Sequence, residues 1–460
     1  MIAVMNCIPT SYSRFSLIRS LAYRAGVSAL VWGLCTAPGV FAAGPTNKNA
    51  ASNAEANSLT GELFYQILLG ELNLREGSPS LGFSLLLDAA RKTNDVGLYS
   101  RSLDVALQAR SGEGALAAAW SWSQAYPQDR QANNQLLQIL IVLGRIADTE
   151  EPLRKEISLS PEAERQSAIA VIPRQYARVS DKKLATQVVT QALEPYLNQR
   201  DTAATAWSVV GRMRLQEDDK VGALQAAQTA LKTDVKSIQP GLLALELVSR
   251  NVDGAEPLLQ QSLSGQTAPD LAMAYVRVLI DQQRYEQAKT ILESITQKHP
   301  QFADAWLVLG SMQFEQGEEA LAEQSLSRYV TLAEKLPAAN TAKGLLQAQS
   351  RRAELLARHG KLDEGRLLLA KLPFSNQEEQ RNKLLTEAHL LRDHRQWQAA
   401  YDLLTQAQSQ DEDVMYEQAM LAEKLNKLDD MERLLRKIIE QNPNYHNAYN
   451  ALGFAFADRN

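Results

Sequence analysis

The stretch Trp306-Leu307-Val308-Leu309-Gly310 places a large aromatic residue three positions before an aliphatic residue that directly precedes a glycine. The same template recurs in Trp207-Ser208-Val209-Val210-Gly211 and in Tyr449-Asn450-Ala451-Leu452-Gly453. Weaker copies lie between them at a nearly constant step, since Ala272 lies 34 positions before Trp306 and Met415 lies 34 positions before Tyr449. A fixed period of this length indicates one structural unit repeated along the chain.

This period and pattern resemble the tetratricopeptide repeat, a helix–turn–helix unit that stacks into a solenoid. The resemblance implies an all-α fold, a superhelical solenoid of tetratricopeptide-type helix pairs. In such a unit the glycine lets the two helices approach closely and the aromatic residue fills the gap beside it. We therefore expect Trp306 to be buried between the helices of its pair.

Other positions of the unit follow the same register. The second helix should carry a small residue, and the candidates are Ala223, Ala288, Ala322 and Ala400. Gly317 and Gly360 are expected in the turn between the helices, and Tyr285 and Trp397 to pack back on the first helix. A proline should close the unit because it cannot extend a helix. The candidates for this role are Pro127, Pro300 and Pro443.

The composition agrees with a helical chain. Glycine and proline are sparse, with 23 and 16 in 460 residues, and strand-like alternation is rare. A solenoid can reach this length because it adds units without enlarging one core. The net charge of −5 is spread over both signs, without a basic stripe that carries interleaved aromatic residues. We therefore expect no nucleic-acid partner.

The N-terminal segment differs from the rest. Three arginines (Arg14, Arg19, Arg24) precede a stretch without charge that runs from residue 25 to residue 47. Val40-Phe41-Ala42 then offers small residues where a signal peptidase reads. This pattern predicts a signal peptide over residues 1–42 and export to the periplasm. An uncleaved helix that anchors the chain in the membrane, with the repeats facing the periplasm, is the alternative.

The remaining boundaries follow from the sequence pattern. Residues 43–60 are small and polar, as in a flexible leader. Residues 61–200 are expected to form degenerate N-terminal helical repeats. Residues 201–460 are expected to form tetratricopeptide repeats that end in a half repeat. The last segment is either a cap or an apolar end that promotes self-association through Phe454.

The sequence contains few residues arranged as a catalytic or metal-binding site would require. Cys7 and Cys35 both lie in the predicted signal peptide, so the mature chain should hold no disulfide and no thiolate metal site. His389 and His394 are five positions apart, whereas helical zinc ligands share a face at four. Phosphate-binding loops and nucleophile elbows are missing. We expect a protein that is not an enzyme and that has no cofactor and no bound metal.

The concave wall of a tetratricopeptide stack is lined by first helices, and the register gives the residues there. They are Arg212, Met273, Arg277, Leu307, Phe314, Leu385, His389, Arg392, Tyr416, Met420 and Phe454. Aromatic, methionine and arginine side chains are typical of adaptable protein-binding surfaces. The sequence therefore predicts a protein-binding groove that recognises a folded partner or an extended segment.

A closer resemblance is carried by residues 62–76, by Leu85–Asp95 and by Asn447–Arg459. These segments are similar to a proteobacterial family of exported repeat proteins that are often outer-membrane lipoproteins. One role in that family is to bind a periplasmic carboxyl-terminal processing protease and present cell-wall hydrolases to it. The resemblance implies an adaptor with that protease and its substrates as partners, and association with the outer membrane.

The chain departs from that family in two places. Leu34 stands before Cys35, where a lipoprotein carries glycine or alanine, and the family continues past the segment that ends at Asn460. The alternative function is a structural assembly or secretion component of a pilus or exopolysaccharide machine.

Overall fold

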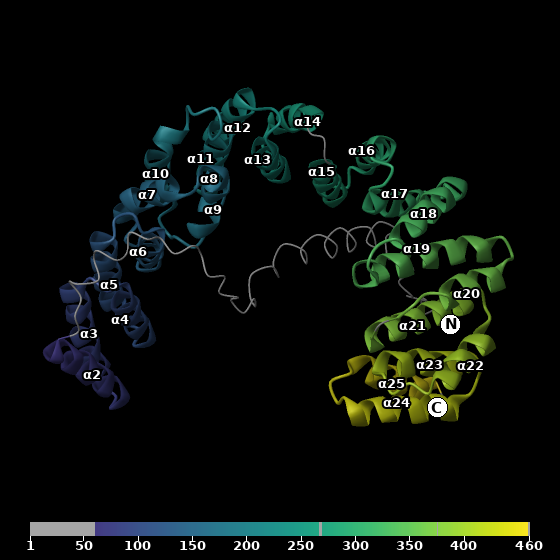
Figure 1. The fold of residues 1–460 in the computed structure, drawn as a ribbon. Helices are drawn as coiled ribbons and strands as arrows, with labels where there is room; N and C mark the ends of the chain where they lie inside the picture. The colour runs from purple at the N-terminus through teal and green to yellow at the C-terminus, as the bar shows by residue number, and fades with distance from the viewer. Residues whose placement is uncertain (1–59, 266–268, 375, 459–460) are drawn as a thin grey trace, which may run out of the picture. The chain divides into compact units, whose positions relative to one another are not determined.

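The computed structural model describes residues 60–265, 269–374 and 376–458. The predicted signal peptide, both cysteines and the leader up to residue 59 lie outside these ranges. All regular elements of the described residues are helices (Figure 1), which confirms the predicted all-α fold. Within the described ranges, helices of the length and apolar character needed to cross a membrane are absent.

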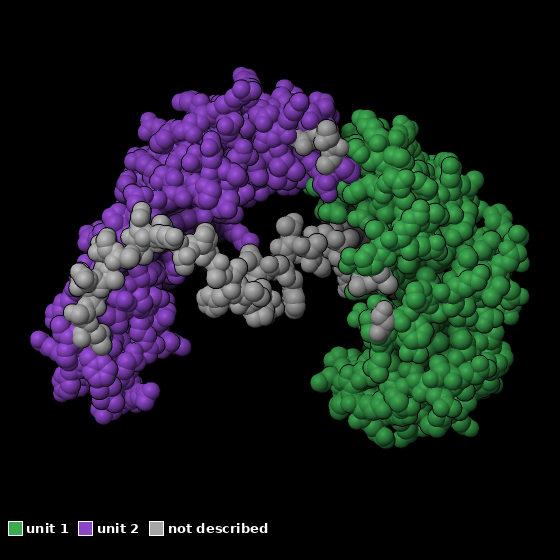
Figure 2. All heavy atoms as spheres, viewed as in Figure 1, with its two compact units in different colours: residues 1–33, 272–460 green, residues 34–271 purple. Residues whose placement is uncertain are grey.

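The helices fall into two compact units that divide between residues 271 and 272 (Figure 2). The helices of the N-terminal unit are α2 (Gly61–Arg75), α3 (Pro79–Thr93), α4 (Val96–Gln108), α5 (Gly112–Ala125), α6 (Arg130–Val142), η2 (Ile146–Thr149), α7 (Glu150–Leu159), α8 (Glu162–Ala170), α9 (Ile172–Gln175), α10 (Lys182–Leu193), η3 (Glu194–Tyr196), α11 (Ala203–Gln216), α12 (Lys220–Thr233), α13 (Ile238–Ser249) and α14 (Ala255–Gly265). The C-terminal unit begins within α15 (Asp270–Asp281).

The C-terminal unit continues as a regular series of helix pairs. Its further helices are α16 (Tyr285–Lys298), α17 (Ala303–Glu315), α18 (Glu319–Ala333), α19 (Ala338–Arg358), α20 (Leu362–Ala370), α21 (Gln377–Asp393), α22 (Trp397–Ala407), α23 (Glu412–Lys424), α24 (Leu428–Gln441) and α25 (His446–Asp458). First helices contact first helices, as α17, α19, α21 and α23 do in turn, so they form one layer of this unit.

The turn within each pair has one recurring geometry. Gly317 and Gly360 have φ values of 79° and 75°, which confirms them as turn residues. Gln283, Arg395 and Asn426 take the same left-handed conformation in their pairs. In each of these five turns, the residue after the left-handed one donates its backbone N–H to the carbonyl five positions before it, at 2.8–2.9 Å. This hydrogen bond closes the first helix of the pair.

The small residues predicted for the second helices are all buried, which confirms the register. Ala223, Ala288, Ala322 and Ala400 have no exposed surface. The signature glycines permit close packing: a Cβ on Gly211 would lie 2.4 Å from Leu243 Cδ2, and one on Gly310 would lie 3.0 Å from the backbone nitrogen of Leu326. The predicted prolines follow the ends of α5, α16 and α24, as expected of residues that close a unit.

Trp306 and Trp397 are less buried than predicted, although Trp306 does pack against a core cluster. Trp306 is only partly buried, and its indole N–H donates to the carbonyl of Pro300 at 3.1 Å. Trp207 makes the matching bond to the carbonyl of Leu197 at 3.1 Å. The ring therefore lies at the edge of the pair, where its N–H finds an acceptor. Trp397, which was expected to pack on a first helix, is 38% exposed.

The last helix, α25, also differs from the expected packing. It contacts α24 through Ala448, Ala451 and Leu452, whereas Tyr449 and Phe456 are exposed. Beyond its own turn of helix, a Cβ on Gly453 would meet no heavy atom of the described residues within 4 Å. The signature residues are thus present in α25 without the close helix contact that they make in α17.

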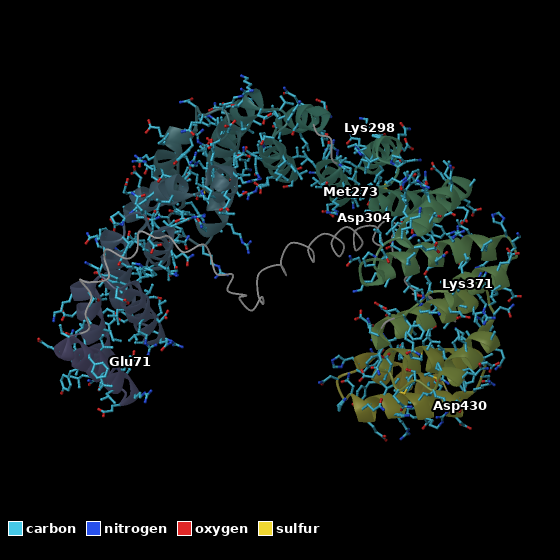
Figure 3. The ribbon with its side chains drawn as sticks, in the orientation of Figure 1. Glu71, Met273, Lys298, Asp304, Lys371 and Asp430 are labelled. Carbon is cyan, nitrogen blue, oxygen red and sulfur yellow. The ribbon has the colours of Figure 1, made fainter. Side chains whose placement is uncertain are left out.

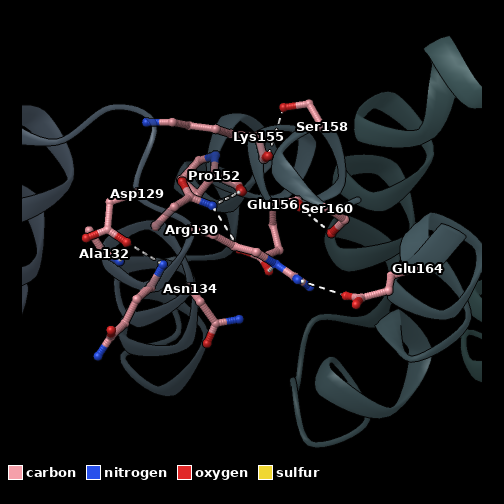
Figure 4. A network of polar contacts seen from close by, with 12 residues as sticks. Asp129, Arg130, Ala132, Asn134, Pro152, Lys155, Glu156, Ser158, Ser160 and Glu164 are labelled. Atoms are coloured by element: carbon pink, nitrogen blue, oxygen red, sulfur yellow. Dashed lines mark hydrogen bonds and ion pairs between the residues drawn. The ribbon is translucent and has the colours of Figure 1, made fainter. Parts of the chain in front are cut away.

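Between residues 130 and 197, where the sequence pattern fades, polar contacts accompany an apolar core that includes Leu153, Ile157 and Ile172 (Figure 4). Asn133 on α6 is buried and donates to the carbonyl of Pro152 at 2.8 Å. Arg130 forms ion pairs with Glu156 at 2.8 Å and with Glu164 at 3.3 Å. The short helices η2, α8, α9 and η3 interrupt the regular helix lengths of the repeat, so the repeat period is not visible in this segment.

Replacing Gly310 with alanine should destabilise the chain by about 1–2 kcal/mol, because the new methyl group meets the backbone of α18. The same replacement at Gly453 should stabilise by roughly 0.5–1 kcal/mol, because alanine favours a helix and has open space there. Urea unfolding of the two variants measures both effects. Equal effects at the two glycines would contradict the packing described for α17.

Candidate protein-binding surface

The predicted groove residues lie on first helices. Arg212 is on α11, Met273 and Arg277 are on α15, Leu307 and Phe314 are on α17, Leu385, His389 and Arg392 are on α21, Tyr416 and Met420 are on α23, and Phe454 is on α25. Helix α21 contacts α23, three of these residues (Leu385, Tyr416, Met420) pack on one apolar cluster, and His389 and Arg392 both contact Glu417. We call Leu385, His389, Arg392, Tyr416 and Met420 the α21–α23 surface.

The α21–α23 surface is held by an ion pair that the sequence did not indicate. Glu417 on α23 accepts a hydrogen bond from Arg392 Nη1 at 2.7 Å, and its other oxygen lies 3.4 Å from His389 Nε2. The Glu417 side chain is only 12% exposed. Burial raises the pKa of Glu417, but His389 and Arg392 lower it further, so the net pKa lies below the ordinary value.

The apolar members of this surface rest on the core of the unit. Leu385, Tyr416 and Met420 are partly buried against the cluster that joins α21 to α25. The Tyr416 ring lies 5.7 Å from that of Tyr445, at an interplanar angle of 52°. Side chains held in this way lose little conformational freedom when a partner binds.

Phe314 forms a second cluster between α17 and α19. The guanidinium carbons of Arg351 and Arg358 lie 5.8 Å and 4.8 Å from the centre of its ring. Arg358 also pairs with Glu354 at 3.1 Å. Neither arginine was predicted, because α19 carries no aromatic–glycine signature from which to set its register.

The other predicted residues have different surroundings. Met273, labelled in Figure 3, is 3% exposed and belongs to the core, so it offers no binding surface. Leu307 packs against the core near Trp306, Arg277 is partly exposed, and Phe454 is 73% exposed. Arg212 pairs across to α13, with Glu246 at 3.3 Å and Gln239 at 3.1 Å.

The repeated helix pairs match known sequence families. Models described as tetratricopeptide repeat match residues 273–337 and residues 413–445. This chain contains tetratricopeptide repeats. The second matched segment covers most of α23 and α24, so it includes Tyr416, Glu417 and Met420 of the surface described above. Tetratricopeptide repeats form protein-binding scaffolds, and catalysis is not their typical role.

A curated relative supports the same assignment. The TPR repeat-containing protein PA4667 of Pseudomonas aeruginosa strain PAO1 is 36% identical over 118 residues, which are 25% of this chain and 20% of that protein. The chain thus aligns with about a fifth of its relative's length.

Two solved structures are also similar. Yeast Tom70 aligns over 87% of this chain and 96% of its own, at 13% identity and a TM-score of 0.30. The P58(IPK) TPR domain aligns over 76% of this chain and 100% of its own, at 15% identity and a TM-score of 0.26.

Replacing Glu417 with glutamine should change how stability depends on pH. A carboxyl group whose pKa is lowered by folding stabilises above its unfolded pKa of about 4.3, and this contribution is lost as pH falls through the folded pKa. Because Arg392 is partly exposed, we expect a contribution of about 1 kcal/mol. We expect the melting temperature of the variant to change less than that of the natural chain between roughly pH 3 and pH 6.

The matched control is Asp393→Asn, which removes the exposed carboxylate 3.0 Å from Arg392 Nε. This control should change stability by less than about 0.5 kcal/mol. A Glu417→Gln variant with the same pH profile as the natural chain would contradict the role assigned to the pair.

Proposed function

We propose that this chain is a noncatalytic protein-binding scaffold of the bacterial cell envelope. The α21–α23 surface carries the proposal, because it places aromatic, methionine and arginine side chains on adjoining first helices, of which α23 lies in a segment matched as a tetratricopeptide repeat. The Glu417 ion pair holds Arg392 in place before any partner arrives. Such rigid aromatic and arginine anchors are the residues that dominate binding energy in protein interfaces.

The more specific form of the proposal is an adaptor that presents cell-wall hydrolases to a carboxyl-terminal processing protease of the periplasm. Its support is the resemblance of residues 62–76, Leu85–Asp95 and Asn447–Arg459 to an exported repeat family with that role. A scaffold suits such a task because neighbouring repeats can hold two proteins at once, which raises their effective concentration.

Affinity capture from a periplasmic extract tests this function. A soluble serine protease together with a peptidoglycan hydrolase is expected among the captured proteins. Recovery of pilin or of a polymer-export channel would instead support a structural role in a pilus or exopolysaccharide machine. Failure to enrich any envelope protein over a column without the chain would contradict the scaffold function.

The envelope location makes a separate prediction. The arginine-rich start, the uncharged stretch and Val40-Phe41-Ala42 are expected to direct export and cleavage, so that the mature chain begins near Ala43. Intact-mass measurement of the protein recovered from cells checks this. A retained Met1, or a lipid on Cys35, would overturn the prediction of a free periplasmic protein.

A further inference from the structure

Helix α2 carries four large apolar side chains on one exposed side. Phe64, Tyr65, Leu68 and Leu72 are between 43% and 64% exposed. The helical period places them within one arc of about 100°. Terminal repeats of a solenoid normally present a polar outer face to water. We call these four residues the head face, and a contiguous apolar face of this kind marks an interaction site.

The contacts of two glycines align α2 with α17. A Cβ on Gly70 would lie 3.1 Å from Leu86 Cγ on α3, and one on Gly310 would lie 2.8 Å from Leu326 Cγ on α18. In both pairs the leucine follows the glycine by 16 positions. Each of the two helices is therefore the first helix of its pair, and the two share one register.

The aligned positions show what covers the head face elsewhere in the chain. Tyr65 and Leu72 take the places in α2 that Ala305 and Met312 have in α17, where both are buried. Helix α18 packs on the glycine of α17, and α19 donates a hydrogen bond to Ser311, so these two helices lie on other sides of α17. The side of Ala305 and Met312 is left to the preceding helix, α16, which also contacts α17. The head face thus corresponds to the side of a first helix that a preceding repeat covers.

Helix α25 has the other sides open. Gly453 and Phe454 take the places in α25 that Gly310 and Ser311 have in α17. In α17 the following helices cover these places, because Gly310 packs on α18 and Ser311 accepts a hydrogen bond from α19 at 3.2 Å. In α25, Phe454 is 73% exposed, and Tyr449, one turn before Gly453, is 45% exposed. We call Tyr449, Gly453 and Phe454 the tail face.

We propose that the head face of one copy of this chain packs on the tail face of another copy, so that copies associate end to end. The head face is the side that a preceding repeat covers, and the tail face is the side that following helices cover, so each supplies what the other lacks. The contact buries leucine and aromatic side chains, which removes apolar surface from water. Because the two faces differ, the contact is heterologous, and a pair of copies keeps one face of each kind for further copies. The inference is independent of the proposed scaffold function.

Sedimentation velocity between about 1 and 100 µM tests the contact, and the average mass of the natural chain should rise over this range. Leu68→Glu on the head face and Phe454→Glu on the tail face should each leave a monomer, because burying an unpaired charge is unfavourable. An equimolar mixture of the two variants should form a dimer and nothing larger, since it contains one intact face of each kind. Association of either variant alone would overturn the proposal, because the contact would then join two like faces.

The matched control is Val142→Glu, which adds the same charge outside both faces. Val142 on α6 is 84% exposed, so this variant should associate as the natural chain does. The melting temperatures of Leu68→Glu and Phe454→Glu should equal that of the natural chain. Phe64→Glu and Tyr449→Glu serve as second variants of the head face and the tail face and should give the same masses. A natural chain that stays monomeric over the whole range, or a mixture of folded variants that forms no dimer, would contradict the end-to-end contact.

Discussion

Replacing Trp122 with alanine is expected to cost about 3–5 kcal/mol of folding free energy, the largest effect of any single substitution proposed for this chain. Trp122 is 1% exposed and lies on α5, in a core cluster that includes Tyr99, Leu136 and Leu140. Its indole N–H has no acceptor among the described residues, so the loss comes from the cavity and not from a broken hydrogen bond.

The control for this prediction lies on the same helix. Trp120 is 42% exposed, and its replacement by alanine should cost less than about 1 kcal/mol. In a stack of repeats each unit contacts only its neighbours, so the damage from Trp122→Ala should centre on α4, α5 and α6. Hydrogen exchange measures this directly. An equal loss of protection in α4 and in α23 would contradict nearest-neighbour coupling.

Replacing Tyr416 with alanine is expected to weaken capture of the natural partner by about 30- to 1000-fold, the usual effect of removing a central aromatic anchor. Tyr416 combines a large ring with a fixed position beside Tyr445. Tyr416→Phe keeps the ring and should retain capture within about threefold. Quantitative mass spectrometry of captured proteins gives the ratio.

A surface substitution provides the reference for the capture assay, and the melting temperature of Tyr416→Ala itself shows whether the repeat stays folded. Arg433 on α24, a second helix, has a side chain that is 64% exposed and pairs only locally with Asp430. Arg433→Ala should leave both capture and the melting temperature unchanged. If Tyr416→Ala and the natural chain captured the partner equally well, the proposal that the α21–α23 surface binds the partner would be contradicted.

Much of the fold could be predicted because each repeat reuses the same short-range physics. The buried positions of Ala322 and Ala400 and the turns at Gly317 and Gly360 follow from the period alone. Between residues 130 and 197 that period is hidden, because short helices such as α9 and η3 change the spacing of the apolar positions that form the core there.

The helices that carry the candidate surface residues were predictable, but the ion pairs that these residues make were not. The register placed Leu385, His389, Arg392, Tyr416 and Met420 on neighbouring first helices, where the structure brings them together. The same register also selected Met273, which packs inward because burial depends on the neighbouring helix and not on the period. The roles of Glu417 and Arg351 were not predicted, because the sequence does not show which charged side chains lie close together in the fold.

Site-specific photo-crosslinking tests the central claim most directly. A photoreactive amino acid placed at Leu385, on the α21–α23 surface, should give adducts with an envelope protein when the full chain is illuminated in living cells. The same group placed at Arg433, on the exposed face of α24, should give few adducts or none. Adducts of equal yield with the same protein at both positions, or adducts at Arg433 alone, would contradict recognition through the first helices.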